Sequence, residues 1–210
     1  NDVNKWGDRR WNYKHGFAIT AVTQSVASPT TFGIFEVDDE FVEACVSTTT
    51  FDVDQSVIHA GTYTIAQLDT VVTVNPGTAG IANFVVDNTS GFASATYSAG
   101  MKIAIADGLT NKLKNTYIIR NTNLVGVNFT IVVEEEILTG DVVASTDYIN
   151  GSLYSPVSDT TAIYVTNPIT DSTVEGRITR RYGMWENIRT GVIPPGTTYP
   201  NGIAYITGVP

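Results

Sequence analysis

Short apolar runs, each closed by Gly, Pro, Asn or Asp, recur along most of the chain. A run rich in β-branched or aromatic residues that ends at a turn signal predicts a β-strand. Examples are residues 17–22, residues 71–74 before Asn75-Pro76-Gly77, and residues 101–106 before Asp107-Gly108. Strands spaced about ten residues apart with such turns favour a sandwich or a barrel over alternating β–α units.

The same reasoning extends along the whole chain. Only two short segments, 55–59 and 109–113, have a pattern that allows a helix. We therefore predict an all-β protein: an antiparallel β-sandwich or barrel-like domain or domains, with extended terminal arms. The predicted strands are residues 17–22, 32–37, 41–47, 63–65, 71–74, 81–86, 101–106, 116–120, 128–138, 141–144, 162–166, 174–182 and 203–209.

The composition supports the same fold class. The chain has 24 Val, 19 Ile and 30 Thr, but only 6 Leu. Side chains branched at Cβ are stiff at χ1 and suit a pleated, half-buried surface, whereas Leu is common in helix cores. At 42% hydrophobic and 16% charged residues, the chain can bury a core. No apolar stretch reaches the roughly 20 residues of a membrane helix.

We predict three regions along the chain. Residues 1–16 form an N-terminal arm, residues 17–190 a β domain, and residues 191–210 an extended segment with a final strand. Three prolines and three glycines in 191–202 exclude a central strand there. An alternative divides the β domain into two modules near 90–115, with the Ser-, Ala- and Gly-rich stretch 91–100 as linker.

Charge is distributed unevenly around the net value of −9. Residues 16–101 contain no Lys or Arg and nine acids, and residues 121–176 contain none and eight acids. An acidic body repels nucleic acid, so we expect no nucleic-acid partner. The basic residues form islands near residues 5–14, 102–120 and 177–189. Opposite charges on one chain suit contacts between copies; the alternative is a scattered, solvated surface.

Two clusters combine basic and aromatic residues, which are the types enriched at the centres of protein interfaces. We predict that both clusters dock on neighbouring subunits. For the first, packing on its own domain and stacking on nucleic-acid bases remain alternatives. For the second and the segment that follows it, the alternative is a well-packed loop that covers a sheet edge. The predicted interface residues are Trp6, Arg9, Arg10, Trp11 and Tyr13, and then Arg180, Arg181, Tyr182 and Trp185.

Candidate chemistry is sparse. His15 and His59 are isolated and Cys45 is the single cysteine, so neither a catalytic triad nor a zinc site is predicted. Asp52-Val53-Asp54 resembles the start of a calcium loop but lacks the later ligands of an EF-hand. We assign no catalytic, cofactor or metal residue, and we predict that the protein is not an enzyme.

The chain resembles the capsid accessory proteins of tailed bacteriophages, of the decoration or cement kind. The features that carry the resemblance are short Thr-, Val- and Gly-rich strands, basic-aromatic ends, a start at Asn1, and Ile193-Pro194-Pro195-Gly196-Thr197 before a final strand. The resemblance implies a structural virion protein on the capsid surface. It would stabilise the shell between neighbouring subunits, and its partners would be the major capsid protein and copies of itself, with a trimer as one form.

Two other functions are compatible with the same sequence. Trp6, Trp11 and Trp185 could stack on sugar rings in a receptor- or carbohydrate-binding β-sandwich of a fibre or adhesin. Alternatively, a terminal strand could join the subunits of an extracellular filament. Both alternatives place the protein outside the cell, and neither requires a membrane.

Overall fold

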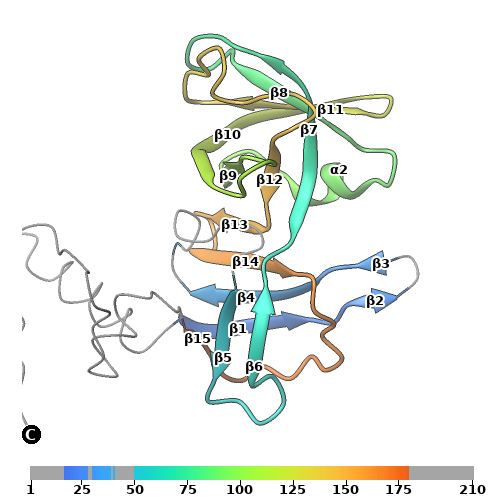
Figure 1. The fold of residues 1–210 in the computed structure, drawn as a ribbon, viewed down its shortest axis with the longest axis vertical. Helices are drawn as coiled ribbons and strands as arrows, with labels where there is room; N and C mark the ends of the chain where they lie inside the picture. Colours follow the sequence, from blue (N-terminus) through green and yellow to red (C-terminus); the bar gives the residue numbers. More distant parts are fainter. Residues whose placement is uncertain (1–16, 28–29, 39, 41–49, 180–210) are drawn as a thin grey trace, which may run out of the picture. The chain divides into compact units, whose positions relative to one another are not determined.

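The computed structural model describes residues 17–27, 30–38, 40 and 50–179, and most of these residues lie in β-strands (Figure 1). The prediction of an all-β, antiparallel fold is confirmed. Among the described residues the single helix is α2 (Phe92–Thr96). The strands are β1 (Phe17–Thr23), β2 (Val26–Ala27), β3 (Thr30–Thr31), β4 (Gly33–Asp38), β5 (Thr50–Asp54), β6 (Gly61–Thr64), β7 (Gln67–Asn75), β8 (Asn83–Asp87), β9 (Lys102–Ala106), β10 (Leu113–Val125), β11 (Asn128–Val133), β12 (Tyr148–Asn150), β13 (Ser152–Ser155), β14 (Thr160–Val165) and β15 (Arg177–Thr179).

Six strands from residues 67–150 close into a ring, which we call the inserted barrel. Each pairs antiparallel with two neighbours, in the order β7, β8, β11, β10, β9, β12 and back to β7. Alternate residues point inward: in β11, for example, Phe129, Ile131 and Val133 are buried. Together with residues from the connections and Leu153 of β13, the inward side chains form a core of 17 buried residues.

The segments on either side of this insertion form a second ring, the host barrel. Its order is β14, β4, β1, β15, β5, β6. The end of β6 returns to β14 through the bridge between Ile65 and Val165 and through two backbone bonds, Ala66 N–H to Tyr164 O (2.9 Å) and Thr166 N–H to Thr64 O (3.0 Å). Its core includes 11 buried residues among those described, and Phe35 and Phe51 pack edge-on within it.

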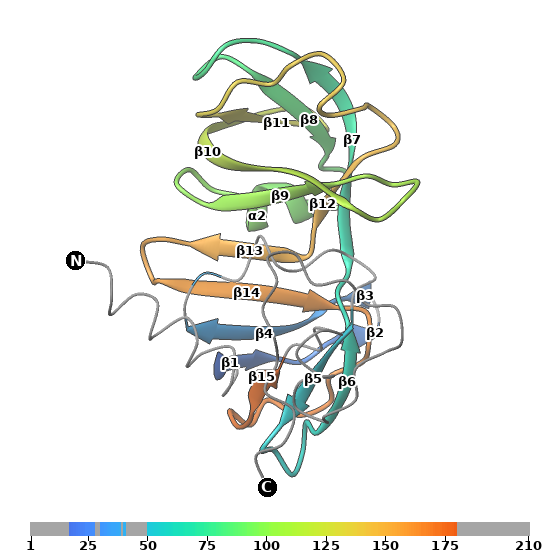
Figure 2. The same cartoon turned by 60° about the vertical axis from the view of Figure 1, so that its left-hand side comes forward.

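The two barrels are joined through β13 and Gly151 (Figure 2). β13 pairs with β14 along its length and meets β9 at Tyr154 and Lys102. Gly151 donates to Ala66 O (2.9 Å) and accepts from Tyr164 N–H (2.7 Å). A Cβ at this position would lie 2.6 Å from Ala66 O, so the backbones approach too closely for any residue but glycine.

The turn signals end strands as predicted: β7 stops at Asn75 and β9 stops at Ala106. Other predictions were wrong. Residues 55–59 and 109–113 form bends and turns rather than helices, and 141–144 is not a strand. The predicted strand 128–138 ends at Val133, and the chain bends at residues 134 and 135.

The chain passes from one core to the other between Ile65 and Leu68, and it returns between Leu153 and Ile163. Residues 90–115, where the sequence suggested a boundary, lie within the inserted barrel, and the stretch 91–100 holds α2. The N-terminal arm 1–16, the predicted strand 41–47 and the extended segment 191–210 lie outside the described residues.

Candidate functional site

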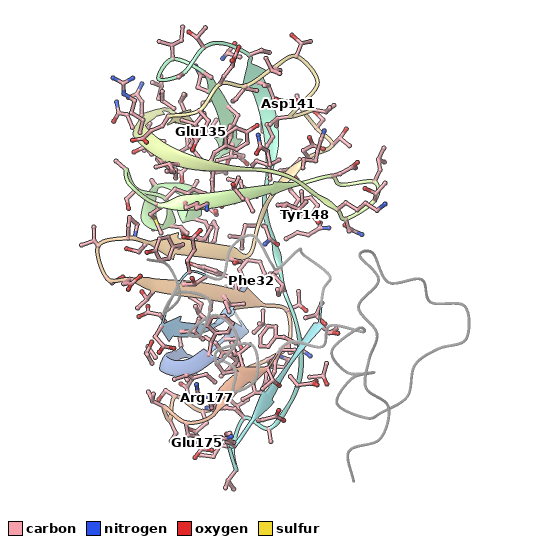
Figure 3. All side chains as sticks on the ribbon, turned by 90° about the vertical axis from the view of Figure 1, so that its left-hand side faces the viewer. Phe32, Glu135, Asp141, Tyr148, Glu175 and Arg177 are labelled. Carbon is pink, nitrogen blue, oxygen red and sulfur yellow. The ribbon has the colours of Figure 1, made fainter. Side chains whose placement is uncertain are left out.

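Polar side chains from two segments far apart in the sequence meet at the connection between β5 and β6 of the host barrel. The segments are residues 54–59 and residues 171–176, and we call them together the Glu175 loop site (Figure 3). The second segment leads into β15, which pairs with β5, so the sheet itself brings the two segments together.

Glu175 fixes the connection by accepting three hydrogen bonds at one carboxylate oxygen. Oε1 accepts from the Ser56 hydroxyl (2.5 Å) and from the backbone N–H groups of Val57 and Ile58 (2.7 Å each). These hydrogen bonds, led by that from Ser56, hold the pKa of Glu175 below its ordinary value, because they favour the ionised carboxylate. The carboxylate therefore acts as a clasp across 118 residues of sequence.

The backbone is also specialised here. Gln55 has φ 55°, in the left-handed region that side chains other than glycine seldom adopt. Gly176 has φ 94°, and a Cβ there would lie 2.9 Å from Ser56 Cβ and 3.0 Å from Asp54 O. Gly176 thus allows the second segment to approach the first closely enough for Glu175 to reach the loop.

His59 anchors the far end of the connection. The side chain is buried, the backbone N–H donates to Ser56 Oγ (2.7 Å), and the ring Nε2 lies 2.9 Å from Thr173 O. Since a carbonyl only accepts, Nε2 carries a proton. The ring also packs edge-on against Phe35 in the core, with centroids 5.6 Å apart. Its role is therefore to tie the loop to the barrel.

The site contains serine, histidine and carboxylates, but they are not arranged as a nucleophile and its base. The Ser56 hydroxyl donates to Glu175 rather than to His59, and the bonded nitrogen of His59 faces a backbone carbonyl. A catalytic serine requires the imidazole as acceptor of its proton. The geometry holds a loop in place and does not activate a hydroxyl.

Aliphatic side chains stand out among the groups that this loop exposes to solvent. Val57 is 94% exposed and Ile58 is 47% exposed, and Val174, next to Glu175 in the chain, is 54% exposed. Turns normally carry polar residues, and a group of exposed aliphatic side chains on a fixed loop is typical of an interaction surface.

Acidic residues flank the apolar tip. Asp54 is exposed and accepts from the Thr179 hydroxyl (2.8 Å); Asp171 is half-buried and accepts from Thr173 N–H (2.7 Å). The Thr173 bonds hold the pKa of Asp171 below its ordinary value. Arg177 lies opposite Asp54 in the β15–β5 pairing, so the described residues 54–59 and 171–177 hold three acids and one base.

A different polar group lies in the inserted barrel, where Lys114 forms an ion pair with the buried Asp147. Lys114 Nζ is 2.9 Å from Asp147 Oδ2, which also accepts from Val143 N–H (2.7 Å). Asp147 is 1% exposed, and its Oδ1 has no hydrogen-bond partner among the described residues. Such a pair is costly to break, because the remaining charge is buried without compensation.

Several other carboxylates among the described residues have structural partners. Glu40 pairs with Lys102, Glu135 Oε2 accepts from Ile118 N–H (2.8 Å), and Asp52 Oδ1 accepts from the hydroxyl of a β6 threonine (2.6 Å). Within residues 17–27, 30–38, 40 and 50–179, no three His, Cys, Asp or Glu side chains are placed to hold a metal ion.

All nine predicted interface residues lie outside the described residues, so the structure places none of them. The structure instead reveals apolar side chains at turns, which the sequence reasoning missed. The signal was present, since each turn contains an aliphatic residue where polar ones prevail. These exposed side chains, by hairpin, are Val57 and Ile58 (β5–β6), Ile81 (β7–β8), Leu109 (β9–β10), Val127 (β10–β11) and Val157 (β13–β14).

Comparison of the chain with protein-family models, with curated proteins and with solved structures gives no match. In the part of the chain that the structure describes, no helix is long and apolar enough to cross a membrane.

Proposed function

We propose that this chain is a structural assembly protein, and specifically an accessory protein of a phage capsid that binds between neighbouring capsid subunits. Its partners in this proposal are the major capsid protein and further copies of the chain itself. It works at the outer surface of the virion and catalyses no reaction.

The observation that carries the proposal is the separation of charge along the chain. The described residues hold 5 basic and 16 acidic residues, a net charge of −11. Residues 1–16 and residues 180–210 each carry a net charge of +2. Together the two segments contain all three tryptophans. Acidic barrels with basic, aromatic ends are complementary to one another when copies meet, which favours ordered contacts between subunits.

The exposed aliphatic side chains at the hairpin turns support the same reading. Single exposed apolar residues are common on any surface, but turns favour Gly, Pro, Asn, Asp and Ser. Aliphatic residues at five successive hairpin connections give the barrels several apolar points of contact. A protein that lies between subunits uses contacts on more than one side.

The proposal is tested by electron microscopy of the native source, with gold-labelled antibodies against this chain. We expect the label to be spread over icosahedral particles. Label confined to fibres or pili, or to the soluble fraction, would overturn the capsid assignment and favour the adhesin or filament functions.

The charge argument is tested by particles assembled in the presence of the full-length variant R9E/R10E. We expect at least a tenfold loss of incorporation relative to the unaltered chain, since like charges across an interface repel. Circular dichroism of the variant serves as the control for its β-structure. Unchanged incorporation would refute a role for the basic end.

A further inference from the structure

We propose that the Glu175 loop site is the docking surface for the basic-aromatic segment 1–16 of a second copy of the chain. This inference rests on the proposed assembly function and specifies one of its contacts. The inference rests on three features that lie together. The loop exposes aliphatic side chains, His59 and Glu175 hold the loop in place, and both segments of the site carry acidic residues.

The apolar half of the contact is built by Val57, Ile58 and Val174. Their exposure leaves aliphatic surface for aromatic rings, and the 1–16 segment supplies Trp6, Trp11 and Tyr13. Aromatic anchors on a fixed aliphatic surface are the usual centre of a protein interface. Because Glu175 already fixes the Val57 and Ile58 backbone, binding requires little further ordering of the loop.

The charged half of the contact is built by Asp54, Asp171 and Glu175. Each uses one carboxylate oxygen in the bonds described above, and the other oxygen has no hydrogen bond within the described part of the chain. These oxygens can accept from guanidinium and ammonium groups. The segment 1–16 supplies four such groups, on Lys5, Arg9, Arg10 and Lys14.

The other exposed turns are less suited to this partner. The β9–β10 turn displays Leu109 but is followed by the basic residues Lys112 and Lys114. The β13–β14 turn displays Val157 beside a single acid, Asp159. The Glu175 loop site differs from both in combining several aliphatic side chains with three acids.

The direction of β1 favours a second copy over the same copy as the source of the segment. Phe17 pairs with Ile178, Ala18 pairs with Arg177, and Ile19 N–H bonds to Gly176 O. Traced backwards from Ile19 to Phe17, the chain therefore moves away from Glu175. An intramolecular contact would require the chain to reverse direction, whereas a contact between copies does not.

The test is the binding of a fluorescein-labelled peptide of residues 1–16 to the full-length protein, measured by fluorescence anisotropy. The full-length variants are V57S/I58S and, as a matched control, V157S. Val157 is 94% exposed, as is Val57, so the control removes the same kind of surface at another turn. All three positions are exposed, and each variant is expected to keep the fold.

We expect V57S/I58S to weaken peptide binding at least tenfold and V157S to change it less than twofold. Binding to the unaltered protein should also weaken with added salt, because charges contribute to it. Equal binding by V57S/I58S and the unaltered protein, or no binding of the peptide to the unaltered protein, would overturn the inference.

The variant E175Q adds an independent measurement. Glutamine keeps an oxygen that accepts the Val57 and Ile58 bonds but loses the charge, so we expect a several-fold weaker affinity with little change in the loop. Light scattering of the full chain then identifies the source of the segment. A mass above that of one chain, lowered by V57S/I58S, supports the contact between copies, and a monomer at every concentration overturns it.

These results are distinguishable from a failure of the proposed function. Gold label on icosahedral particles together with normal peptide binding by V57S/I58S would retain the capsid assignment and reject this docking site. Label elsewhere together with the expected loss of binding would reject the capsid assignment and retain the contact between copies.

Discussion

The inserted barrel and the host barrel are built from the same kind of strand, but they close in different ways. The inserted barrel is one continuous segment, residues 67–150, and each neighbouring pair of strands forms a paired ladder. The host barrel is made from two segments and closes at β6 and β14 through one bridge and two backbone bonds. Among the described residues, its core has 11 buried residues against 17.

This difference suggests that one barrel contributes more to stability and the other to the proposed function. A continuous segment can order itself before the rest of the chain, because its contacts are closer in sequence. The host barrel depends on the insertion to bring β6 and β14 together, and it also carries the β1 and β15 ends and the Glu175 loop site. The barrel with the weaker closure is thus the one that holds the proposed docking surface.

The largest expected effect comes from truncating one fully buried phenylalanine in each core. F84A in the inserted barrel and F35A in the host barrel should each cost about 3–5 kcal/mol of unfolding free energy, because each leaves a cavity. We expect F84A to lower amide protection in both barrels and F35A to lower it mainly in the host barrel. Denaturant unfolding and hydrogen exchange measure both quantities.

The expected difference between the barrels would be wrong if F84A and F35A had the same pattern of hydrogen exchange. Equal loss of protection in both barrels would mean that they unfold as one unit. Loss confined to the inserted barrel in F84A would mean that the host barrel does not need the insertion for its closure.

The next effect concerns the ion pair in the inserted barrel. K114M leaves the Asp147 carboxylate buried and without its cation, and it should cost about 3 kcal/mol of unfolding free energy. K112M, at an exposed lysine two residues away, should change stability by less than about 0.5 kcal/mol. Urea unfolding of both variants measures the difference, and equal stability would show that the pair contributes nothing.

A smaller effect is expected at the junction of the barrels. G151A places a Cβ 2.6 Å from Ala66 O, and the backbone must shift to accept it, at about 1–3 kcal/mol. The control is G77A, where the nearest atom to the added Cβ is 3.7 Å away. Thermal unfolding should show a lower melting temperature for G151A alone. Similar values for both variants would contradict the close approach.

The smallest effect is local and depends on pH. The pKa of Glu175 is lowered by the bonds from Ser56, Ile58 and Val57, so the stabilisation that the ionised carboxylate adds to the clasp is present above the ordinary glutamate pKa of 4.5. That added stabilisation is lost as pH falls through the lower folded value, although a neutral side chain still has an oxygen that can accept the Val57 and Ile58 bonds. The amide resonances of Val57 and Ile58 should therefore titrate with a midpoint below 4.5. His59 and Asp171 are the neighbouring titratable groups, and E175Q identifies the part due to Glu175. A midpoint at or above 4.5 would contradict the clasp.

The candidate site was only partly predictable. The sequence draws attention to His59, Asp52 and Asp54, but the pattern of residues 55–59 allows a helix where the structure has a bent loop. Glu175 did not stand out, because its role depends on Ser56 and Val57, which lie 119 and 118 residues earlier. Gly176 is equally inconspicuous in sequence, since its need for positive φ arises from the approach of the first segment.

The sequence by itself determined the all-β class, because stiff β-branched residues and turn signals such as Asn75-Pro76-Gly77 act locally. It also determined the separation of an acidic body from basic ends. The tertiary structure decided that the strands form two barrels, one inserted in the other, and that β6 returns to β14. Those choices depend on hydrogen bonds and buried contacts between residues as far apart in the sequence as Phe17 and Ile178, which no local pattern encodes.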